Sequence, residues 1–234
     1  MKIDALTFDV FGTVTDWRST IIYEGKQLQR DNKSLGIDWA DFASEWRSGY
    51  LEGTQEIQRG NREWMTIDEL HLVTLKKLLP RFGVTDLGEQ EICDLNRVWH
   101  RLQPWPEAVQ GLHRLKEKFV IAALSNGNLS LLTHMAKNAR LPWDCILSSE
   151  FAGTYKPAPR VYEKAAELLG MNPSQIMMVA AHEQDLRGAQ AVGFQTAFVS
   201  RPMEFGPHKQ SDHNVSGFDI VAADFTDLAE QLTG

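Results

Sequence analysis

The chain has 234 residues, of which 43% are hydrophobic and 24% are charged, a composition typical of a globular protein. Its formal net charge of −7 argues against broad binding to nucleic acid or to an anionic membrane, so no nucleic-acid or membrane partner is expected. Its two cysteines form neither a CxxC pair nor a disulfide framework, and no apolar run has signal-peptide or membrane-spanning length, so we expect a cytoplasmic protein.

The first predicted element is a short buried strand within ALTFDVF (residues 5–11) that ends at Asp9. Residues 16 to about 102 then show almost only helical periodicity. One predicted helix begins after Asp38, a plausible N-cap, and places its apolar residues on one face through residue 50. A second helix starts at the capping box formed by Thr66 and Glu69, with Gly83 as its predicted C-cap.

The pattern changes at Pro106, where helices and short apolar strands begin to alternate. The predicted strands are FVIAAL (119–124), CILSS (145–149), QIMMVAA (175–181), QTAFVS (195–200) and FDIVAADF (218–225). Such alternation predicts an α/β fold with a parallel sheet covered by helices. The helical block after the first strand is therefore predicted to be an insertion, lying over the sheet edge where open α/β sheets bind ligands.

Polar side chains follow four of these strands. They are Asp9, Ser125 with Asn126, Lys156 and Asp185. Because parallel strands end at one edge of a sheet, these groups should converge in one crevice. A carboxylate such as Asp9 can act as a nucleophile, and a lysine beside it would keep it ionised. Taken singly, several candidate residues also have a structural explanation: Asp9 or Ser125 could cap a turn or helix, and Arg47 or Tyr162 could simply pair or pack on a helix. Lys156 is different, because a YKP sequence after a strand has few structural reasons to exist.

Four motifs occur in an order that resembles the haloacid dehalogenase superfamily, and most closely its L-2-haloacid dehalogenase branch. They are FDVFGT (8–13), Trp46–Arg47, LSNG (124–127) and YKPAPRVY (155–162). The resemblance covers essentially the whole chain. It implies a Rossmann-like core formed by residues 1–14 and 104–234, with an α-helical cap formed by residues 15–103.

Phe11 separates this chain from the magnesium-dependent phosphatases of the superfamily, which carry an aspartate general acid two residues after the nucleophile. The final motif, AAHEQDLRG (180–188), also lacks their Gly-Asp pair. Without these acids, a phosphatase could neither protonate its leaving group well nor hold Mg²⁺ well. A halide, by contrast, leaves without a proton. We therefore expect neither a metal nor another cofactor.

The resemblance implies that Asp9 displaces halide from C2 of a small 2-halocarboxylate, forming an ester that water then hydrolyses. The roles it implies for the other residues are as follows: Arg47 and Asn126 receive the halide; Thr13, Ser125 and Lys156 orient Asp9 and bind the substrate carboxylate; Phe11 and Gly12 lie beside the substrate; Tyr162 and Asp185 complete the site; and Trp64 lines the halide pocket. The partners implied are the substrate and halide, and a homodimer, since related enzymes are often dimers.

The final motif departs from the branch, which usually has Ser-Ser-Asn where this chain has Ala180, Ala181 and His182. One hypothesis is that His182 serves as base or water-orienting group in ester hydrolysis. The change leaves other functions open: another metal-free hydrolase of a small carboxylate such as azetidine-2-carboxylate, a magnesium-dependent phosphatase, or a non-catalytic binding protein on the same fold.

Overall fold

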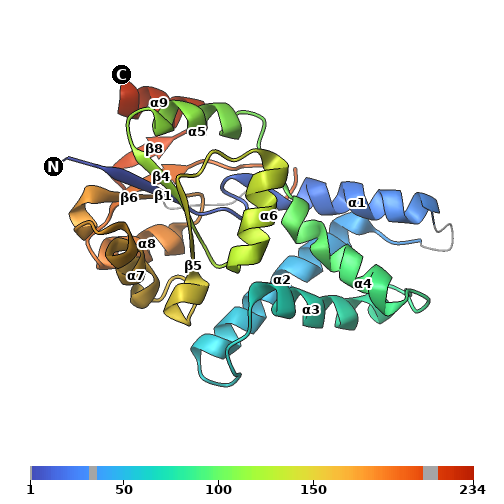
Figure 1. Cartoon of the computed structure of the whole chain (residues 1–234). Helices are drawn as coiled ribbons and strands as arrows, with labels where there is room; N and C mark the ends of the chain where they lie inside the picture. The colour runs from blue at the N-terminus through green and yellow to red at the C-terminus, as the bar shows by residue number, and fades with distance from the viewer. Residues whose placement is uncertain (1, 32–35, 208–215) are drawn as a thin grey trace.

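The computed structural model describes residues 2–31, 36–207 and 216–234. Its central sheet has six parallel strands in the order β5-β4-β1-β6-β7-β8 (Figure 1). The strands are β1 (Ala5–Phe8), β4 (Val120–Ser125), β5 (Cys145–Ser148), β6 (Ile176–Ala180), β7 (Gln195–Val199) and β8 (Ile220–Ala222). The α/β fold with a parallel sheet that the sequence predicts is confirmed, and β1 lies in the middle of the sheet.

Helices cover both faces of this sheet, which is why the strands are apolar on both sides. One face packs against α5 (Ala108–Lys116), α9 (Phe225–Thr233) and the end of α6 (Leu129–Ala139). The other packs against α7 (Pro159–Leu169) and α8 (Glu183–Ala191). Successive residues of β6 point to opposite faces of the sheet. Met177 and Val179 pack on the face covered by α5 and α9, and Met178 packs on the face covered by α7 and α8.

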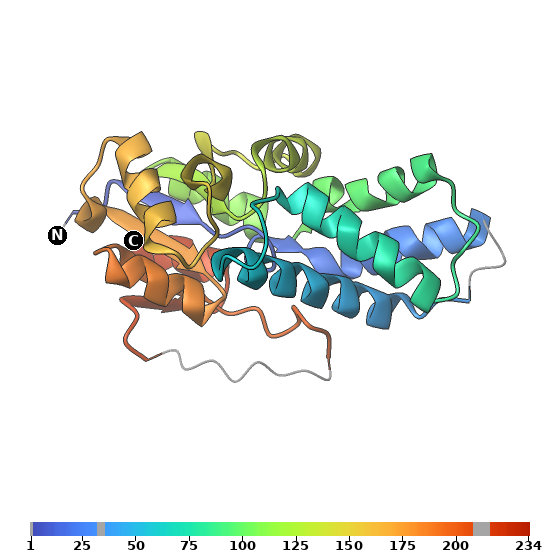
Figure 2. The same ribbon diagram turned by 90° about the horizontal axis from the view of Figure 1, so that it is seen from below.

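The remaining helices lie together beyond one edge of the sheet (Figures 1 and 2). They are α1 (Trp17–Asp31), α2 (Trp39–Gln58), α3 (Ile67–Arg81) and α4 (Glu89–Asn96), followed by the 3-10 turn η1 (Arg97–Arg101). A two-stranded antiparallel ribbon, β2 (Thr15–Asp16) with β3 (Gln103–Pro104), joins this helical region to the rest of the chain. Two further 3-10 turns, η2 (Ser149–Ala152) and η3 (Pro173–Gln175), connect elements of the core.

The ends of the long helical elements follow from local hydrogen bonds. The Asp38 carboxylate accepts bonds from two backbone N–H groups of α2, as the sequence predicts. The capping box of Thr66 and Glu69 likewise begins α3. The C-cap of α3 differs from the prediction: Phe82 is the cap, and Gly83 follows it with φ 75°, because the turn into the left-handed region comes one residue after the cap.

The register of the sheet aligns the chemistry. Phe8 pairs with Ala123 of β4 and with Val179 of β6, so the residues that follow these three strands meet at one edge. The helical region stands over that edge, with the Phe11 ring belonging to its apolar cluster. No helix in the described part of the chain is long and apolar enough to span a lipid bilayer.

Candidate active site

A cavity of about 370 Å³ lies at this edge, between the helical region and the sheet. The helical region contributes Arg47, Tyr50 and Leu51 from α2. The rest of the lining comes from strand ends and loops of the core: Asp9, Asn126, Lys156, Pro157, His182, Glu183, Gln184, Asp185 and Phe205. The convergence of strand-end groups expected from the topology is therefore present in the structure.

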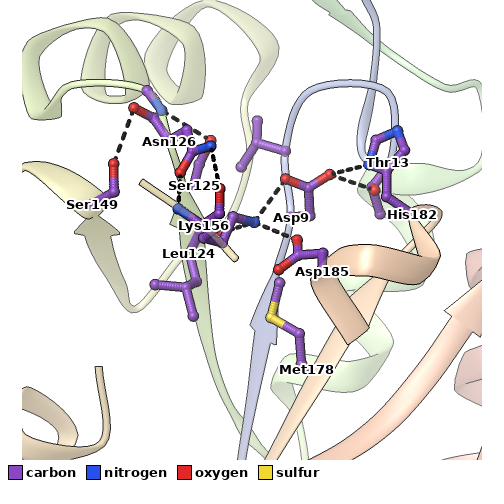
Figure 3. Close-up of polar contacts among 12 residues, drawn as sticks. Asp9, Thr13, Leu124, Ser125, Asn126, Ser149, Lys156, Met178, His182 and Asp185 are labelled. Carbon is purple, nitrogen blue, oxygen red and sulfur yellow. Dashed lines mark hydrogen bonds and ion pairs between the residues drawn. The ribbon is translucent and has the colours of Figure 1, made fainter. Parts of the chain in front are cut away.

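Asp9 has a hydrogen-bond donor on each carboxylate oxygen (Figure 3). Its Oδ1 lies 2.9 Å from Lys156 Nζ, while its Oδ2 accepts a 2.8 Å bond from the Thr13 hydroxyl and lies 3.1 Å from His182 Nδ1. Burial alone would raise the pKa of Asp9, but the charge of Lys156 and the hydrogen bond from His182 hold that pKa far below its usual range. The side chain is thus an ionised carboxylate inside the protein.

Lys156 bridges the two acids of the site. Besides Asp9, its Nζ contacts Asp185 Oδ2 at 2.5 Å and donates to the Leu124 carbonyl at 2.8 Å. Burial would lower the pKa of Lys156, but the charges of Asp185 and Asp9 outweigh burial and raise it. Tyr162 donates to the other oxygen of Asp185 at 2.6 Å. Lys156 is therefore a fixed cation whose position is set from three sides.

The Thr13 hydroxyl can point in only one direction. It accepts a 2.9 Å bond from the Ala181 N–H, so its own hydrogen is directed to Asp9 Oδ2. Ala181 follows β6, and Thr13 lies in the turn after β1. The contact therefore ties the turn after β1 to the loop that carries His182.

His182 lies between two carboxylates. Its Nδ1 faces Asp9, and its Nε2 lies 3.1 and 3.0 Å from the two oxygens of Glu204. Burial lowers the pKa of His182, but the Glu204 charge and the hydrogen bonds to Asp9 and Glu204 raise it to about 10. The imidazole is therefore protonated at neutral pH. About a quarter of its side chain, 26%, remains exposed to the pocket.

The turn after β4 positions an amide beside Lys156. Asn126 Oδ1 accepts a 2.8 Å bond from the Lys156 backbone N–H, and its Nδ2 donates to the Tyr50 hydroxyl at 3.4 Å. Ser125 is fully buried, and its Oγ accepts a 3.2 Å bond from the Gly127 N–H. Asn126 thus reaches the pocket, while Ser125 shapes the turn beneath it.

Arg47 is a buried cation surrounded by aromatic rings. Its guanidinium carbon lies 4.8 Å from the Tyr50 ring centre, 5.7 Å from that of Trp17 and 6.0 Å from that of Phe11. Within the described part of the chain, its Nε and Nη1 are buried without a hydrogen-bond partner. A buried arginine with unused donors is suited to receiving an anion.

Phe11 and Gly12 hold the turn after β1 in place. The Phe11 ring packs edge-on against Trp99 and supports Arg47. Gly12 adopts φ 85°, and a Cβ on it would lie 2.1 Å from Glu204 Oε1. Only glycine fits here, because both the backbone conformation and the adjacent carboxylate exclude a side chain.

The structure does not bring Trp64 into this pocket. The Trp64 side chain stacks on Tyr155, with ring centres 6.4 Å apart, and is 38% exposed. Tyr155 in turn donates a hydrogen bond to the Met65 carbonyl. This aromatic pair joins the loop before α3 to the loop that precedes Lys156, outside the cavity lining.

Sequence reasoning missed Glu204 and assigned Tyr50 to packing alone. Glu204 follows β7 by five residues and is 1% exposed. The rule that polar residues after parallel strands meet at one edge of the sheet also covers Glu204, because it lies shortly after the predicted strand QTAFVS. Tyr50 belongs to the apolar face of α2, yet its hydroxyl also reaches Asn126.

Among the described residues, no group of three or more His, Cys, Asp or Glu side chains is arranged to hold a metal ion. The acids of the site are occupied instead by Lys156 and His182. The arrangement is that of an ionised carboxylate facing a small pocket that contains a free guanidinium and an amide.

Comparison with known proteins matches residues 3–193 to the model of the haloacid dehalogenase-like hydrolases. The (S)-2-haloacid dehalogenase 4A of Burkholderia cepacia is 28% identical over 227 residues, which cover 92% of this chain and 93% of that protein. The crystal structure of the L-2-haloacid dehalogenase PA0810 has a TM-score of 0.94 at 39% identity, covering 99% of both chains. That of the defluorinating L-2-haloacid dehalogenase Rha0230 has a TM-score of 0.95 at 42% identity, covering 99% of this chain and 96% of that one.

Proposed function

The chain belongs to the haloacid dehalogenase-like hydrolases and, within them, to the L-2-haloacid dehalogenase branch, and we propose that it hydrolyses the carbon–halogen bond of a small 2-haloalkanoic acid. A cavity of about 370 Å³ has room for small substrates such as haloacetates and L-2-halopropionates. The product is the corresponding 2-hydroxy acid.

The observation that carries this proposal is the state of Asp9. It is an ionised carboxylate, desolvated and oriented by Lys156 and Thr13, at the wall of a pocket that also contains Arg47. A carboxylate in a water-poor site is a stronger nucleophile than one in bulk water, and its covalent adduct divides a difficult displacement into two easier steps.

In the first step, an oxygen of Asp9 attacks C2 of the substrate from the side opposite the halogen. The C–O bond forms as the carbon–halogen bond breaks, so the configuration at C2 inverts. The unused donors of Arg47 and the amide of Asn126 stabilise the departing halide. Lys156 stays charged throughout. Its three hydrogens are directed to Asp9, Asp185 and the Leu124 carbonyl, so its contact with Asp9 stabilises the ester carbonyl oxygen.

In the second step, water attacks the Asp9 carbonyl carbon and the C–O bond to the substrate breaks. The 2-hydroxy acid leaves, and Asp9 is regenerated as a carboxylate. Once it has lost its own proton, His182 is the group placed to accept one from this water, because its Nδ1 faces Asp9 and part of its ring is open to the pocket. Histidine thereby takes the place of the amide usual in this branch.

Halide release measured by ion chromatography tests the proposal. The substrates are chloroacetate, fluoroacetate and L-2-chloropropionate, each with EDTA present, and the wild type is compared with Asp9→Asn. We expect the wild type to release one halide for each 2-hydroxy acid formed, with or without EDTA. Asp9→Asn should abolish this release. No release from any of the three substrates would overturn the proposal, and hydrolysis of azetidine-2-carboxylate in its place would retain the aspartyl ester but change the substrate class.

A further inference from the structure

Glu204 is a buried acid beside the pocket to which the proposed reaction gives no role. It lies 1% exposed in the segment after β7, on the far side of His182 from Asp9. A buried carboxylate is costly unless it is paired, and this one is held by His182 at 3.0 Å and by the Trp17 indole N–H at 3.1 Å. Gly12 leaves the space into which the carboxylate fits.

We propose that Glu204 is a positioning residue that fixes the tautomer of His182 and makes it the general base for hydrolysis of the Asp9 ester. The inference rests on the proposed aspartyl-ester reaction. It concerns only the second step, because Glu204 touches His182 and leaves the nucleophile and the halide to Lys156, Thr13 and Arg47.

The geometry determines which nitrogen acts. Both oxygens of Glu204 face Nε2, so the carboxylate requires a proton on that nitrogen. When the imidazole is neutral, its lone pair is therefore on Nδ1, which points to Asp9. A carboxylate that orients a histidine in this way also makes its opposite nitrogen more basic.

The charge of Asp9 controls when His182 becomes a base. With Asp9 ionised, the imidazole is held as a cation between two anions, since burial is outweighed by Glu204 and Asp9. Esterification removes the Asp9 charge, so the pKa of His182 falls and Nδ1 releases its proton to solvent. The other charged groups near the pair are Arg47, which acts on Glu204, and Lys156 with Asp185 on the opposite side of Asp9.

The proton count closes over the cycle. Neutral His182 takes one proton from the attacking water at Nδ1 as the new C–O bond forms at the Asp9 carbonyl carbon. When the tetrahedral intermediate collapses, His182 returns that proton to the departing alkoxide, giving the 2-hydroxy acid. Asp9 is then left as a carboxylic acid, and it passes its proton to His182. The resting imidazolium is restored, and the cycle releases one proton to solvent.

Glu204→Gln separates charge from shape, because the amide oxygen can still accept from Nε2 while the anion is gone. The experiment uses rapid mixing with L-2-chloropropionate: halide release reports the first step, and mass spectrometry of the quenched protein reports the Asp9 ester. We expect halide release in the first turnover to stay within a few-fold of wild type, and ester hydrolysis to slow by about 100-fold. The rate of ester hydrolysis should rise with pH as His182 loses its proton. In the variant this rising limb should lie at lower pH than in the wild type, because the pKa of His182 is lower.

Glu107→Gln is the matched control, because it removes an equal charge from a neighbouring ion pair. Glu107 precedes α5 and lies 2.6 Å from Arg201, which belongs to the same segment after β7 as Glu204. It should leave the pH limb in place. A second variant addresses specificity: His182→Gln combined with Glu204→Gln should hydrolyse the ester no more slowly than His182→Gln alone, because Glu204 acts through His182. Glu204→Asp, which keeps the charge, should keep the limb near its wild-type position, whereas a purely structural role for Glu204 predicts no such recovery.

The outcomes are distinct. An ester that accumulates in Glu204→Gln with a displaced pH limb supports the inference. Equal slowing of both steps, an unmoved limb, or additive losses in the double variant would overturn it while leaving the proposed function intact. A wild type that, in one turnover in ¹⁸O-labelled water, places the label on the product and none on Asp9 would overturn the inference together with the ester mechanism.

Discussion

Lys156 Nζ lies 2.9 Å from Asp9 Oδ1, and both side chains are almost entirely removed from solvent. Isolated charges are strongly disfavoured in a protein interior, and here Asp9 is paired with Lys156 and His182, while Lys156 is paired with Asp9 and Asp185. The pair is placed by topology: Asp9 follows the central strand β1, and Lys156 comes from the segment between β5 and α7. The ionised state of Asp9 is therefore a consequence of how the strands are ordered in the sheet.

Replacing Lys156 by methionine should cost both stability and activity. The variant leaves Asp9 and Asp185 as neighbouring buried carboxyls with no cation between them, so the pKa of Asp9 should rise. We expect the free energy of unfolding to fall by about 3–5 kcal/mol, measured by urea denaturation. Halide release at neutral pH should be lost. A variant that keeps wild-type stability and a tenth or more of the activity would show that Lys156 does not hold Asp9 ionised.

The protonation of His182 should be visible in the pH dependence of stability. Its folded pKa is raised from 6.5 to about 10 by Glu204 and Asp9 despite burial, so its contribution is fully present below pH 6.5 and is lost as pH rises through about 10. The difference in Tm between wild type and His182→Gln should therefore shrink across that window. Groups that do not contact His182 titrate alike in both proteins and cancel in the comparison. A constant difference from pH 6 to 10 would contradict a protonated His182.

Arg47 should matter most for poor leaving groups. In the proposed reaction its buried donors stabilise charge that develops on the halide, and that charge is greater when the carbon–halogen bond is harder to break. We expect Arg47→Ala to slow halide release in the first turnover by at least about 100-fold with L-2-chloropropionate. The loss should be smaller with L-2-bromopropionate. An equal loss with both substrates would indicate a role in packing or in binding the substrate carboxylate.

Gly12 should not tolerate even alanine. A residue with a Cβ at φ 85° costs about 1–2 kcal/mol, and this Cβ would also overlap Glu204 at 2.1 Å. We expect Gly12→Ala to lower the free energy of unfolding by at least about 2 kcal/mol, measured by denaturant titration. It should also displace Glu204 and so slow ester hydrolysis more than halide release. Gly153→Ala has a similar φ of 64° with open space around it, and it isolates the backbone cost from the overlap.

Much of the site follows from one rule about parallel sheets. The residues at the ends of predicted strands, such as Asp9 and Asp185, meet because the strands run in the same direction and end at one edge. Short apolar runs identify the strands, and the four ordered motifs assign the family. The two helix N-caps were also predictable, since Asp38 and Thr66 make local hydrogen bonds that require no tertiary information.

The remaining features depend on the path of irregular segments and on packing between distant parts of the chain. Glu204 reaches His182 because the irregular segment after β7 passes next to Gly12. The path of such a segment cannot be predicted from hydrophobic periodicity. Tyr50 looks like a packing residue in an apolar helical face, because its distant partner, Asn126, cannot be identified from α2 alone. Trp64 precedes α3 in a loop whose alignment to the family is loose, and its position on Tyr155 is set by a tertiary contact.

The covalent role of Asp9 can be tested directly by one turnover in ¹⁸O-labelled water, with the protein in excess over L-2-chloropropionate. Water that attacks the Asp9 ester carbonyl leaves its oxygen on Asp9, whereas water that attacks C2 leaves its oxygen on the product. We predict one ¹⁸O atom in the peptide that contains Asp9 and unlabelled 2-hydroxypropionate, both measured by mass spectrometry. Labelled product with an unlabelled Asp9 peptide would contradict the aspartyl-ester mechanism.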